Sequence, residues 1–283
     1  MNKLTMAKRT AVVAALVEGN SIRATARMTD VSKPTILKLL ADLGEACAAY
    51  HDAQVRSLKS QRIQVDEIWS FIGAKERNVS AEKKQGQSWG DCWTWSAIDA
   101  DSKMIISYLV GPRSPRMAFA LMSDVASRIE GRVQLTTDGL YWYPHAVERA
   151  FGIGVDYAML QKHYGQGSSS GTSRYSPARF TGATREVITG TPDARHISTS
   201  YAERQHLSMR MGMRRYTRLT NAFSKKLENH VAANALYFLH YNFARIHRTL
   251  RVTPAMAAGI ATHVWSVQEI VALLDVETET RAA

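Results

Sequence analysis

The stretch RIQVDEIWSFIG, residues 62–73, constrains the fold of this chain more than any other. Its residues are mostly apolar and prone to form strands, which is typical of a strand in a protein core. Asp66 and Glu67 nevertheless stand in its middle. Because an ionised carboxylate is not buried without a partner, Asp66 must either face solvent from an edge strand or have a cation beside it.

The other strand-like stretches alternate with helical ones in an order that predicts a mixed sheet. Runs rich in β-branched and aromatic residues indicate strands at residues 62–73, 92–100, 103–111, 133–139 and 155–162. Amphipathic runs indicate helices at residues 114–131 and 143–152, and again from Ser198 to about Arg245, with a break near Gly212. This order is typical of an α/β fold, here a mixed five-stranded sheet flanked by helices. The glycines and the serine run of residues 163–195 predict a loop.

Residues 6–46 have the pattern of three helices. Ser21 and Ser32 are expected N-caps, Pro34 suits a first helical turn, and Asp30 suits left-handed geometry in the turn between the second and third helices. A helix, a short helix, a tight turn and a helix form the plan of a helix-turn-helix. The first residues of its second helix reach base edges in the major groove, which predicts DNA contacts from Lys33, Thr35 and Lys38. The alternative is a three-helix bundle without a DNA contact.

The charge balance favours a polyanionic partner. Lys and Arg number 36 against 25 Asp and Glu, a net charge of +11, which favours nucleic acid before a membrane surface. Two cysteines form neither a disulfide framework nor a four-ligand metal site, so the chain suits a reducing cytoplasm. No stretch approaches the roughly 20 apolar residues of a membrane span.

Three acidic residues stand where a folded sheet can bring them together. Asp66 lies in the first strand, Asp138 ends the fourth, and Glu203 lies near the start of a later helix. If the first and fourth strands are neighbours, Asp66 and Asp138 can meet, and the helix can add Glu203. Grouped carboxylates suit Mg²⁺, with Mn²⁺ able to substitute. Two such ions roughly 3.5–4 Å apart clamp the attacking and leaving oxygens of a phosphoryl transfer.

Each of these acids also has a purely structural interpretation. Asp66 could point outward from an edge strand, and Asp138 precedes Gly139 as in many turns. Glu203 follows Ser200 by three residues, as in a capping box. Two rival acids come after the second strand, in a sequence typical of a hairpin turn: Asp99 and Asp101.

A basic run follows Glu203. Between residues 204 and 226 the chain contains no Asp or Glu. On a continuous helix, Arg210 and Arg214 would share the face of Glu203. A cationic surface beside an acidic metal site suits a phosphodiester substrate, although a solvated helix face is the alternative. The arginines of this run that we expect to bind DNA are Arg204, Arg210, Arg214, Arg215 and Arg218.

Four motifs carry a resemblance to a known family: VDEIWSFIG, TTDGLYWYP, YAERQHLSMRMGMRRYTRLTNAFSKKLENH and YNFARIHRTLRVTPAMAAGI. Through them the chain resembles, over nearly its whole length, the DDE transposases of the insertion-sequence-one family. Those proteins combine an N-terminal helix-turn-helix with a ribonuclease H-like (retroviral-integrase) catalytic core. The resemblance implies that Asp66, Asp138 and Glu203 form the catalytic, metal-binding triad, and that Arg210 helps to position DNA near the cut. The separation of Asp138 and Glu203, 203 − 138 = 65 residues, is long for the superfamily, and the loop at 163–195 accounts for it as an insertion.

The resemblance also implies a division of the chain. We expect a helix-turn-helix domain at 1–46, a linker at 47–61, a ribonuclease H-like domain at 62–250 with its insertion loop at 163–195, and a C-terminal helical tail at 251–283.

The function implied is that of a Mg²⁺-dependent DNA transposase. Such an enzyme binds the terminal inverted repeats of an insertion sequence, cleaves the DNA and transfers 3′-hydroxyl ends to target DNA. We expect a homodimer or larger homo-oligomer in a bacterial cytoplasm, associated with the nucleoid. Two alternatives remain open: a DNA-binding regulator with an inactive core, and a ribonuclease H or resolvase-type nuclease.

Overall fold

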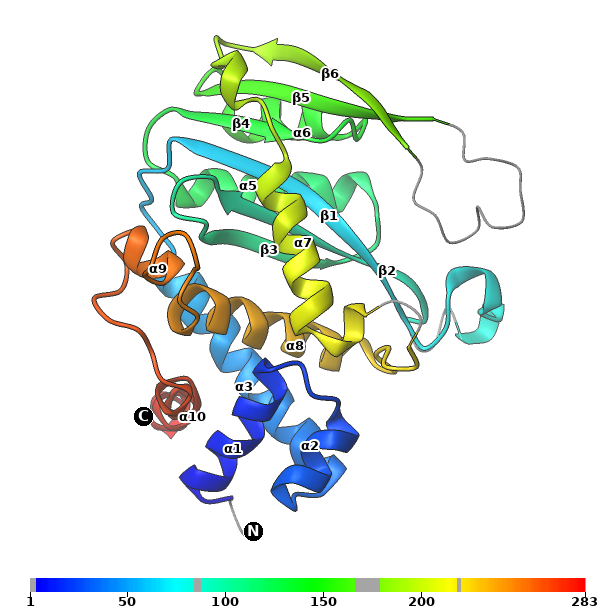
Figure 1. Ribbon diagram of the computed structural model, residues 1–283, viewed down its shortest axis with the longest axis vertical. Helices are drawn as coiled ribbons and strands as arrows, with labels where there is room; N and C mark the ends of the chain where they lie inside the picture. The colour runs from blue at the N-terminus through cyan, green and yellow to red at the C-terminus, as the bar shows by residue number, and fades with distance from the viewer. Residues whose placement is uncertain (1–3, 84–87, 166–178, 218–219, 283) are drawn as a thin grey trace.

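A single mixed sheet organises the chain in the computed structural model (Figure 1), which describes residues 4–83, 88–165, 179–217 and 220–282. Its strand order is β3-β2-β1-β4-β5-β6. Strand β1 is antiparallel to β2 and parallel to β4, β3 is antiparallel to β2, and β5 is parallel to β4 and antiparallel to β6. The strands are β1 (Arg62–Ile72), β2 (Gly90–Asp99), β3 (Ile105–Gly111), β4 (Val133–Thr137), β5 (Val155–Tyr164) and β6 (Phe180–Thr189).

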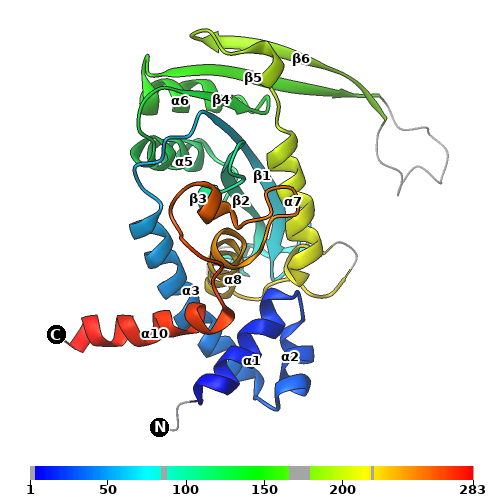
Figure 2. The same ribbon diagram turned by 60° about the vertical axis from the view of Figure 1, so that its left-hand side comes forward.

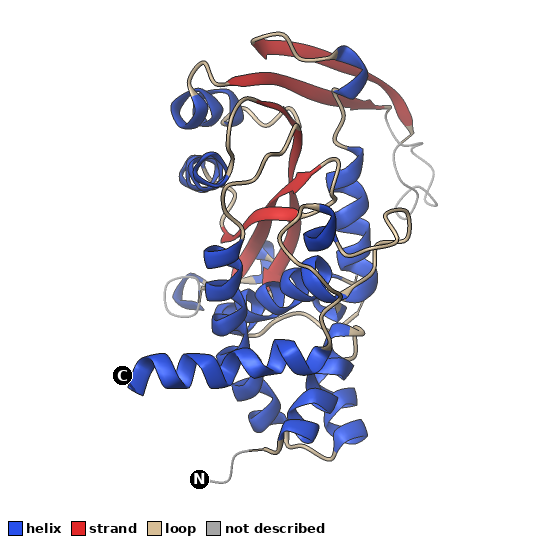
Figure 3. Ribbon diagram, turned by 90° about the vertical axis from the view of Figure 1, so that its left-hand side faces the viewer, coloured by secondary structure: helices blue, strands red, loops and turns tan. Residues whose placement is uncertain are grey.

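Helices cover both faces of the sheet. Figure 3 shows helices on both sides of the strands. The helices of the core are α5 (Pro115–Arg128), α6 (Tyr143–Phe151), α7 (Ser200–Gly212) and α8 (Leu227–Leu239), the last continued by a π-helical turn (His240–Ala244). Short 3₁₀ turns lie at Glu76–Asn78, Ala194–His196 and Arg214–Tyr216. The predicted α/β class, a mixed sheet flanked by helices, is thus confirmed.

Alternation along β1 explains why two helical layers form. Ile63 and Val65 are buried in the core cluster that includes α5 and α6. Ile68 is buried in a second cluster with residues of α7 and α8. Because successive strand residues point to opposite faces, a strand that is apolar on both faces needs a helix layer on each side.

The sheet has one strand more than the five predicted. The predicted strands are observed as β1 to β5, but residues 180–189 form β6, paired antiparallel with β5, inside the segment expected to be a loop. Most residues of β6 are exposed, so its sequence lacks the apolar alternation that signals a half-buried strand. Residues 166–178 of the predicted insertion loop lie outside the described part of the chain.

Three N-terminal helices form as the sequence predicts, and the second and third begin after the predicted N-caps. They are α1 (Met6–Val17), α2 (Ile22–Thr29) and α3 (Lys33–Gln54). The Ser21 hydroxyl accepts a hydrogen bond from the Ala24 amide, and the Ser32 hydroxyl accepts one from the Thr35 amide. Asp30 has the expected left-handed conformation, with φ of 53° and ψ of 38°.

Helix α3 extends beyond the predicted helical unit. It continues to Gln54 through the predicted linker, after which Val55 and Leu58 are buried against the sheet. Along its length α3 packs against α8, and α10 (Val267–Ala282) crosses it, as Figure 2 shows. A short helix, α9 (Pro254–Ala257), precedes α10 in the predicted C-terminal tail. The N-terminal helices therefore share one apolar core with α8 and α10.

Among the described residues, no helix combines the length and the apolar character that crossing a membrane requires.

Candidate active site

Asp66 and Asp138 meet because of the register between β1 and β4. These strands pair in parallel from Arg62 with Gln134 to Val65 with Thr137. An aspartate follows each residue of this last pair, Asp66 within β1 and Asp138 directly after β4, so both carboxylates lie at the same end of the ladder. The predicted neighbourhood of the first and fourth strands is confirmed, and Asp66 is not on an edge strand.

Glu67 forms a third member of this carboxylate group. It points to the opposite face of β1 from Asp66 and is almost completely buried. Its Oε1 accepts a hydrogen bond from Arg113 Nε at 2.8 Å and forms an ion pair with Arg113 Nη2 at 2.6 Å, and its Oε2 accepts a hydrogen bond from the Tyr143 hydroxyl at 3.0 Å. Arg113 and Tyr143 therefore satisfy both oxygens of a carboxylate that would otherwise be costly to bury.

Oxygen atoms of Asp66, Glu67 and Asp138 all lie within 4.8 Å of one another. Burial, followed by the negative charges of Glu67 and Asp66, raises the pKa of Asp138 to about 7. Burial and the charge of Asp66 also raise the pKa of Glu67. No cationic side chain in the described part of the chain forms an ion pair with Asp138. The site thus carries more negative charge than its own residues neutralise.

Glu203 faces the same cavity from α7. Its Oε1 accepts one hydrogen bond from the Lys162 ammonium group and a second, at 2.6 Å, from the Thr199 hydroxyl. The N-cap of α7 is Thr199 and not Ser200, so the capping box considered from the sequence does not form. Glu203 is not a member of the group formed by Asp66, Glu67 and Asp138, and its ion-pair partner is Lys162.

A cavity of about 780 Å³ connects these acids. Asp66, Asp138 and Glu203 all line it, together with Glu67. Its cationic lining comes from different elements: Arg113 after β3, Lys162 on β5 and Arg210 on α7. Opposite charges at one opening suit a ligand that contacts a cation held by the carboxylates and carries negative charge itself.

His206 contacts Asp66 at the wall of this cavity. The ring is buried, with Nδ1 3.3 Å from Asp66 Oδ2 and Nε2 3.3 Å from the Ser96 hydroxyl. His206 lies one helical turn after Glu203 on α7. The helix therefore supplies both a carboxylate and an imidazole to the region around Asp66.

The donor atoms fit a divalent cation of the magnesium type. Carboxylate oxygens are the ligands that such hard cations prefer, and one or two carboxylates commonly suffice when a substrate supplies the rest. Asp66 and Asp138 are the best candidates, since Arg113 and Tyr143 already occupy Glu67. The rival acid Asp99 accepts hydrogen bonds from the amides of Asp101 and Ser102, which confirms the predicted hairpin turn.

The predicted DNA-binding residues separate into different parts of the surface. Lys33, Thr35 and Lys38 are exposed on α3, while Ile36 and Leu40 are buried. Arg204 is exposed on α7, and Arg210 lines the carboxylate cavity as expected. Helix α7 ends at Gly212, at the predicted break, so the continuous helix on which Arg214 would share the face of Glu203 does not form. Arg214 and Arg215 line another cavity. Arg218 lies outside the described residues.

Sequence reasoning assigned no role to three groups of the site: Arg113, Lys162 and His206. Lys162 and Arg113 reach the acids only through strand order, which no local pattern reveals. His206 had a signal, because its i+3 position places it on the helix face of Glu203. Glu67 had one too, as a second carboxylate in an apolar strand.

Comparisons with known proteins yield one kind of match. No family model matches the chain, and no curated protein matches it in sequence. Among solved structures, it is similar to a chain of the cryo-EM structure of the piggyBac transposase synaptic complex with hairpin DNA. The TM-score is 0.42 and the identity 9%, over 98% of this chain and 72% of that one. At this level of likeness, function must be inferred from the residues of this chain.

Proposed function

We propose that this chain is a DNA transposase of the DDE type, related to the insertion-sequence-one family. In this proposal it binds the terminal inverted repeats of an insertion sequence, cleaves the DNA and joins 3′-hydroxyl ends to target DNA. The observation that carries the proposal is the parallel register of β1 and β4, which places Asp66 beside Asp138 at a cavity also lined by Glu203.

Asp66, Asp138 and Glu203 are the proposed ligands of two Mg²⁺ ions. When bound, such a pair activates the attacking oxygen and stabilises the leaving oxygen of a phosphoryl transfer. The protein's own residues have separate tasks. Arg210 and Lys162 line the cavity as cations that can hold the phosphodiester backbone. His206 orients Asp66 through the contact between Nδ1 and Oδ2.

The net charge of +11 supports a nucleic-acid substrate. The exposed residues of α3 supply a surface that suits recognition of DNA ends. Helix α3 begins with the predicted N-cap and follows a tight left-handed turn at Asp30, as a helix-turn-helix requires.

A strand-transfer assay tests the proposal. The purified chain is incubated with duplexes from the DNA that flanks its coding region and with a supercoiled target, with Mg²⁺, with Mn²⁺ or with EDTA. We expect joined products only with the metals. They should disappear in Asp66→Asn and Asp138→Asn but persist in Glu148→Gln, which removes an exposed carboxylate from α6.

The same assay separates the alternatives. Binding to end DNA without cleavage by the unmodified chain would indicate a regulator with an inactive core. Metal-dependent cleavage without joined products would indicate a nuclease of the ribonuclease H or resolvase type. Joined products from the Asp66→Asn variant would refute the assignment of the carboxylates.

A further inference from the structure

A second cavity, of about 920 Å³, separates the N-terminal helices from the segment that follows α7. One wall comes from α1, α2 and α3, and the other from residues 213–237. The two walls meet where the turn after α1 approaches the end of α7. A Cβ atom on Gly19, whose φ is +80°, would lie 3.0 Å from the carbonyl oxygen of Gly212. This cavity is distinct from the carboxylate cavity, since the two share no lining residue.

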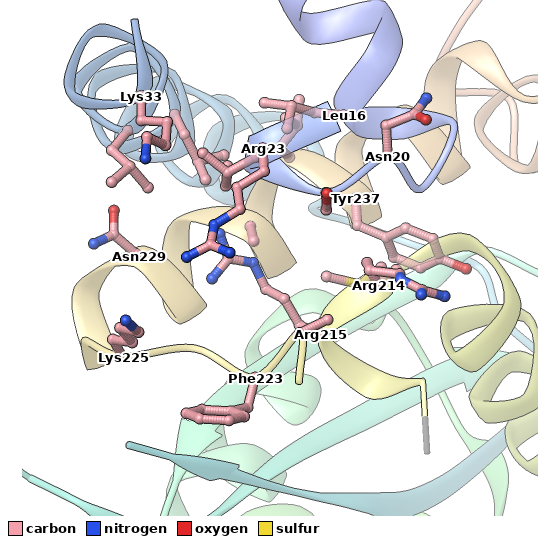
Figure 4. A pocket seen from close by; sticks show the side chains of 18 of the residues that line it. Leu16, Asn20, Arg23, Lys33, Arg214, Arg215, Phe223, Lys225, Asn229 and Tyr237 are labelled. Carbon is pink, nitrogen blue, oxygen red and sulfur yellow. The ribbon is translucent and has the colours of Figure 1, made fainter. Parts of the chain in front are cut away.

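The described lining of this cavity is cationic. It includes no Asp or Glu, and its polar neutral groups are asparagines, a serine and a threonine, together with a tyrosine. Six basic side chains line it, two from the helical wall and four from the other: Arg23, Lys33, Arg214, Arg215, Lys225 and Lys226. Figure 4 shows the side chains of Arg23 and Arg215 extending from opposite walls into the space between them.

Arg215 is the centre of this arrangement. Its side chain is partly buried and donates a hydrogen bond to the Ser224 hydroxyl at 2.7 Å. Burial lowers its pKa to about 10. A guanidinium group has five N–H donors, and among the described residues no carboxylate forms an ion pair with this one. The buried Arg128, by contrast, is paired with both Asp52 and Asp124.

Most of the neighbouring cations also lack a carboxylate partner among the described residues. Arg23, Lys33, Arg214 and Lys225 form no ion pair with any described residue, whereas Lys226 lies 3.4 Å from Glu228. Several positive charges around one cavity repel one another, and this repulsion falls when an anion enters. Guanidinium groups bind phosphate oxygens in bidentate geometry, which makes a phosphate the matching anion.

We propose that this cavity is a clamp for the sugar-phosphate backbone of DNA, between the N-terminal helices and the segment after α7. The proposal rests on the proposed function, which makes DNA the ligand. Because Lys33 also starts α3, DNA lying on that helix is adjacent to the cavity. The clamp contacts the backbone and does not read bases, since phosphate contacts position DNA without sequence information.

Fluorescence anisotropy with labelled duplexes in a salt series tests the clamp in the full chain. The variants are Arg215→Gln and the double variant Arg23→Gln/Lys225→Gln, which removes one exposed cation from each wall. The matched control is Arg149→Gln, an exposed arginine on α6 across the sheet. Each clamp variant should bind end DNA and random DNA about tenfold more weakly or worse. The slope of log K against log salt should flatten by roughly one unit per lost contact.

Several outcomes are decisive. Affinities and slopes equal to those of Arg149→Gln would overturn the clamp, and the exposed double variant decides this even if Arg215→Gln is unstable. Inorganic phosphate is the second probe. If it raises the thermal midpoint of the unmodified chain but not of Arg215→Gln, while both bind DNA equally, the cavity holds a small anion and the clamp is wrong. If the clamp variants lose affinity but the unmodified chain yields no metal-dependent cleavage, the clamp stands and the proposed function fails.

Discussion

The imidazole of His206 on α7 contacts the carboxylate of Asp66 on β1. Nδ1 of His206 lies 3.3 Å from Asp66 Oδ2, and Nε2 lies 3.3 Å from the Ser96 hydroxyl on β2. Asp66 and Ser96 are direct neighbours across the β1–β2 ladder, so α7 bridges the two strands through one ring. This contact fixes the orientation of the first proposed metal ligand.

His206→Ala should therefore weaken metal-dependent cleavage. Residues that hold a metal ligand in place without touching the metal typically contribute about 10–100-fold to metal affinity or activity. Titration calorimetry with Mn²⁺ should show the loss as weaker metal binding, while DNA affinity in EDTA stays unchanged. Ser96→Ala, which removes only the distal contact, should have a smaller effect. Unchanged Mn²⁺ affinity in His206→Ala would exclude the positioning role.

Asp66→Asn and Asp138→Asn should each abolish cleavage, beyond the loss expected for His206→Ala, and leave DNA binding nearly intact. Asp138→Asn should also make the metal-free protein more stable at pH 8. The pKa of Asp138 is raised to about 7 in the folded state, whereas its value in the unfolded state is about 4. Between about pH 4 and pH 7 the folded state therefore binds a proton that the unfolded state has lost. Stability from this group is present at low pH and falls as the pH rises through that window.

Thermal unfolding in EDTA between pH 5 and pH 8 measures how the stability contributed by Asp138 depends on pH. The unmodified chain should lose more stability over the range than Asp138→Asn. Adding Mg²⁺ at pH 8 should raise the midpoint of the unmodified chain but not of the variant, because a ligand that binds only the folded state stabilises it. Equal Mg²⁺ effects on both would remove Asp138 from the metal site.

Glu67 and Glu203 should have different roles despite their common cavity. Glu67→Gln leaves Arg113 and Tyr143 with a weaker partner in a buried position, so we expect destabilisation by about 3–5 kcal/mol, typical of a broken buried ion pair. Glu203→Gln should barely change stability, since that side chain is 42% exposed, but should abolish strand transfer. Denaturant titration and the strand-transfer assay on both variants measure the two effects. If Glu67→Gln were stable but inactive and Glu203→Gln were active, Glu67 would have the role in strand transfer that we assign to Glu203.

Thr35 and Lys38 should contribute to recognition of the ends. Replacing either by Ala should reduce the preference for end DNA over random DNA by about 1–3 kcal/mol per lost base contact. Competition binding with both duplexes measures it. Single substitutions are the right probe, because α3 shares a core with α8 and a deletion of the N-terminal helices would expose that core. An unchanged preference in both variants would place recognition elsewhere in the chain.

Gly44→Ala should destabilise the fold, although alanine is the better helix former by about 1 kcal/mol. A Cβ atom at residue 44 would lie 2.4 Å from the Cβ and 2.5 Å from the Cα of Ala232, so α3 and α8 would have to separate. Overpacking of this kind typically costs about 1–3 kcal/mol. Urea unfolding measures the change in the free energy of unfolding. A decrease supports overpacking between α3 and α8, since helix propensity alone predicts an increase. A more stable Gly44→Ala would show that α3 moves freely against α8.

The sequence by itself determined the features that depend on near neighbours. The caps at Ser21 and Ser32 and the left-handed turn at Asp30 need only residues within one helical turn, and all three are observed. The strands β1 to β5 follow from alternation or continuous apolar runs. The meeting of Asp66 with Asp138 needed one further assumption, that β1 and β4 are neighbours, and the parallel register confirms it.

Only the tertiary structure decided what depends on long-range packing. Strand β6 is exposed, so its backbone pairing with β5 leaves no pattern in its side chains. Because α7 ends at Gly212, Arg214 lines a different cavity from Arg210. On a continuous helix the two side chains would share one face. The partners of Glu67 and Asp66 come from residues 46 to 140 positions away, as Arg113 and His206 show (113 − 67 = 46; 206 − 66 = 140). Such contacts arise from strand order and helix packing, which no short stretch of sequence encodes.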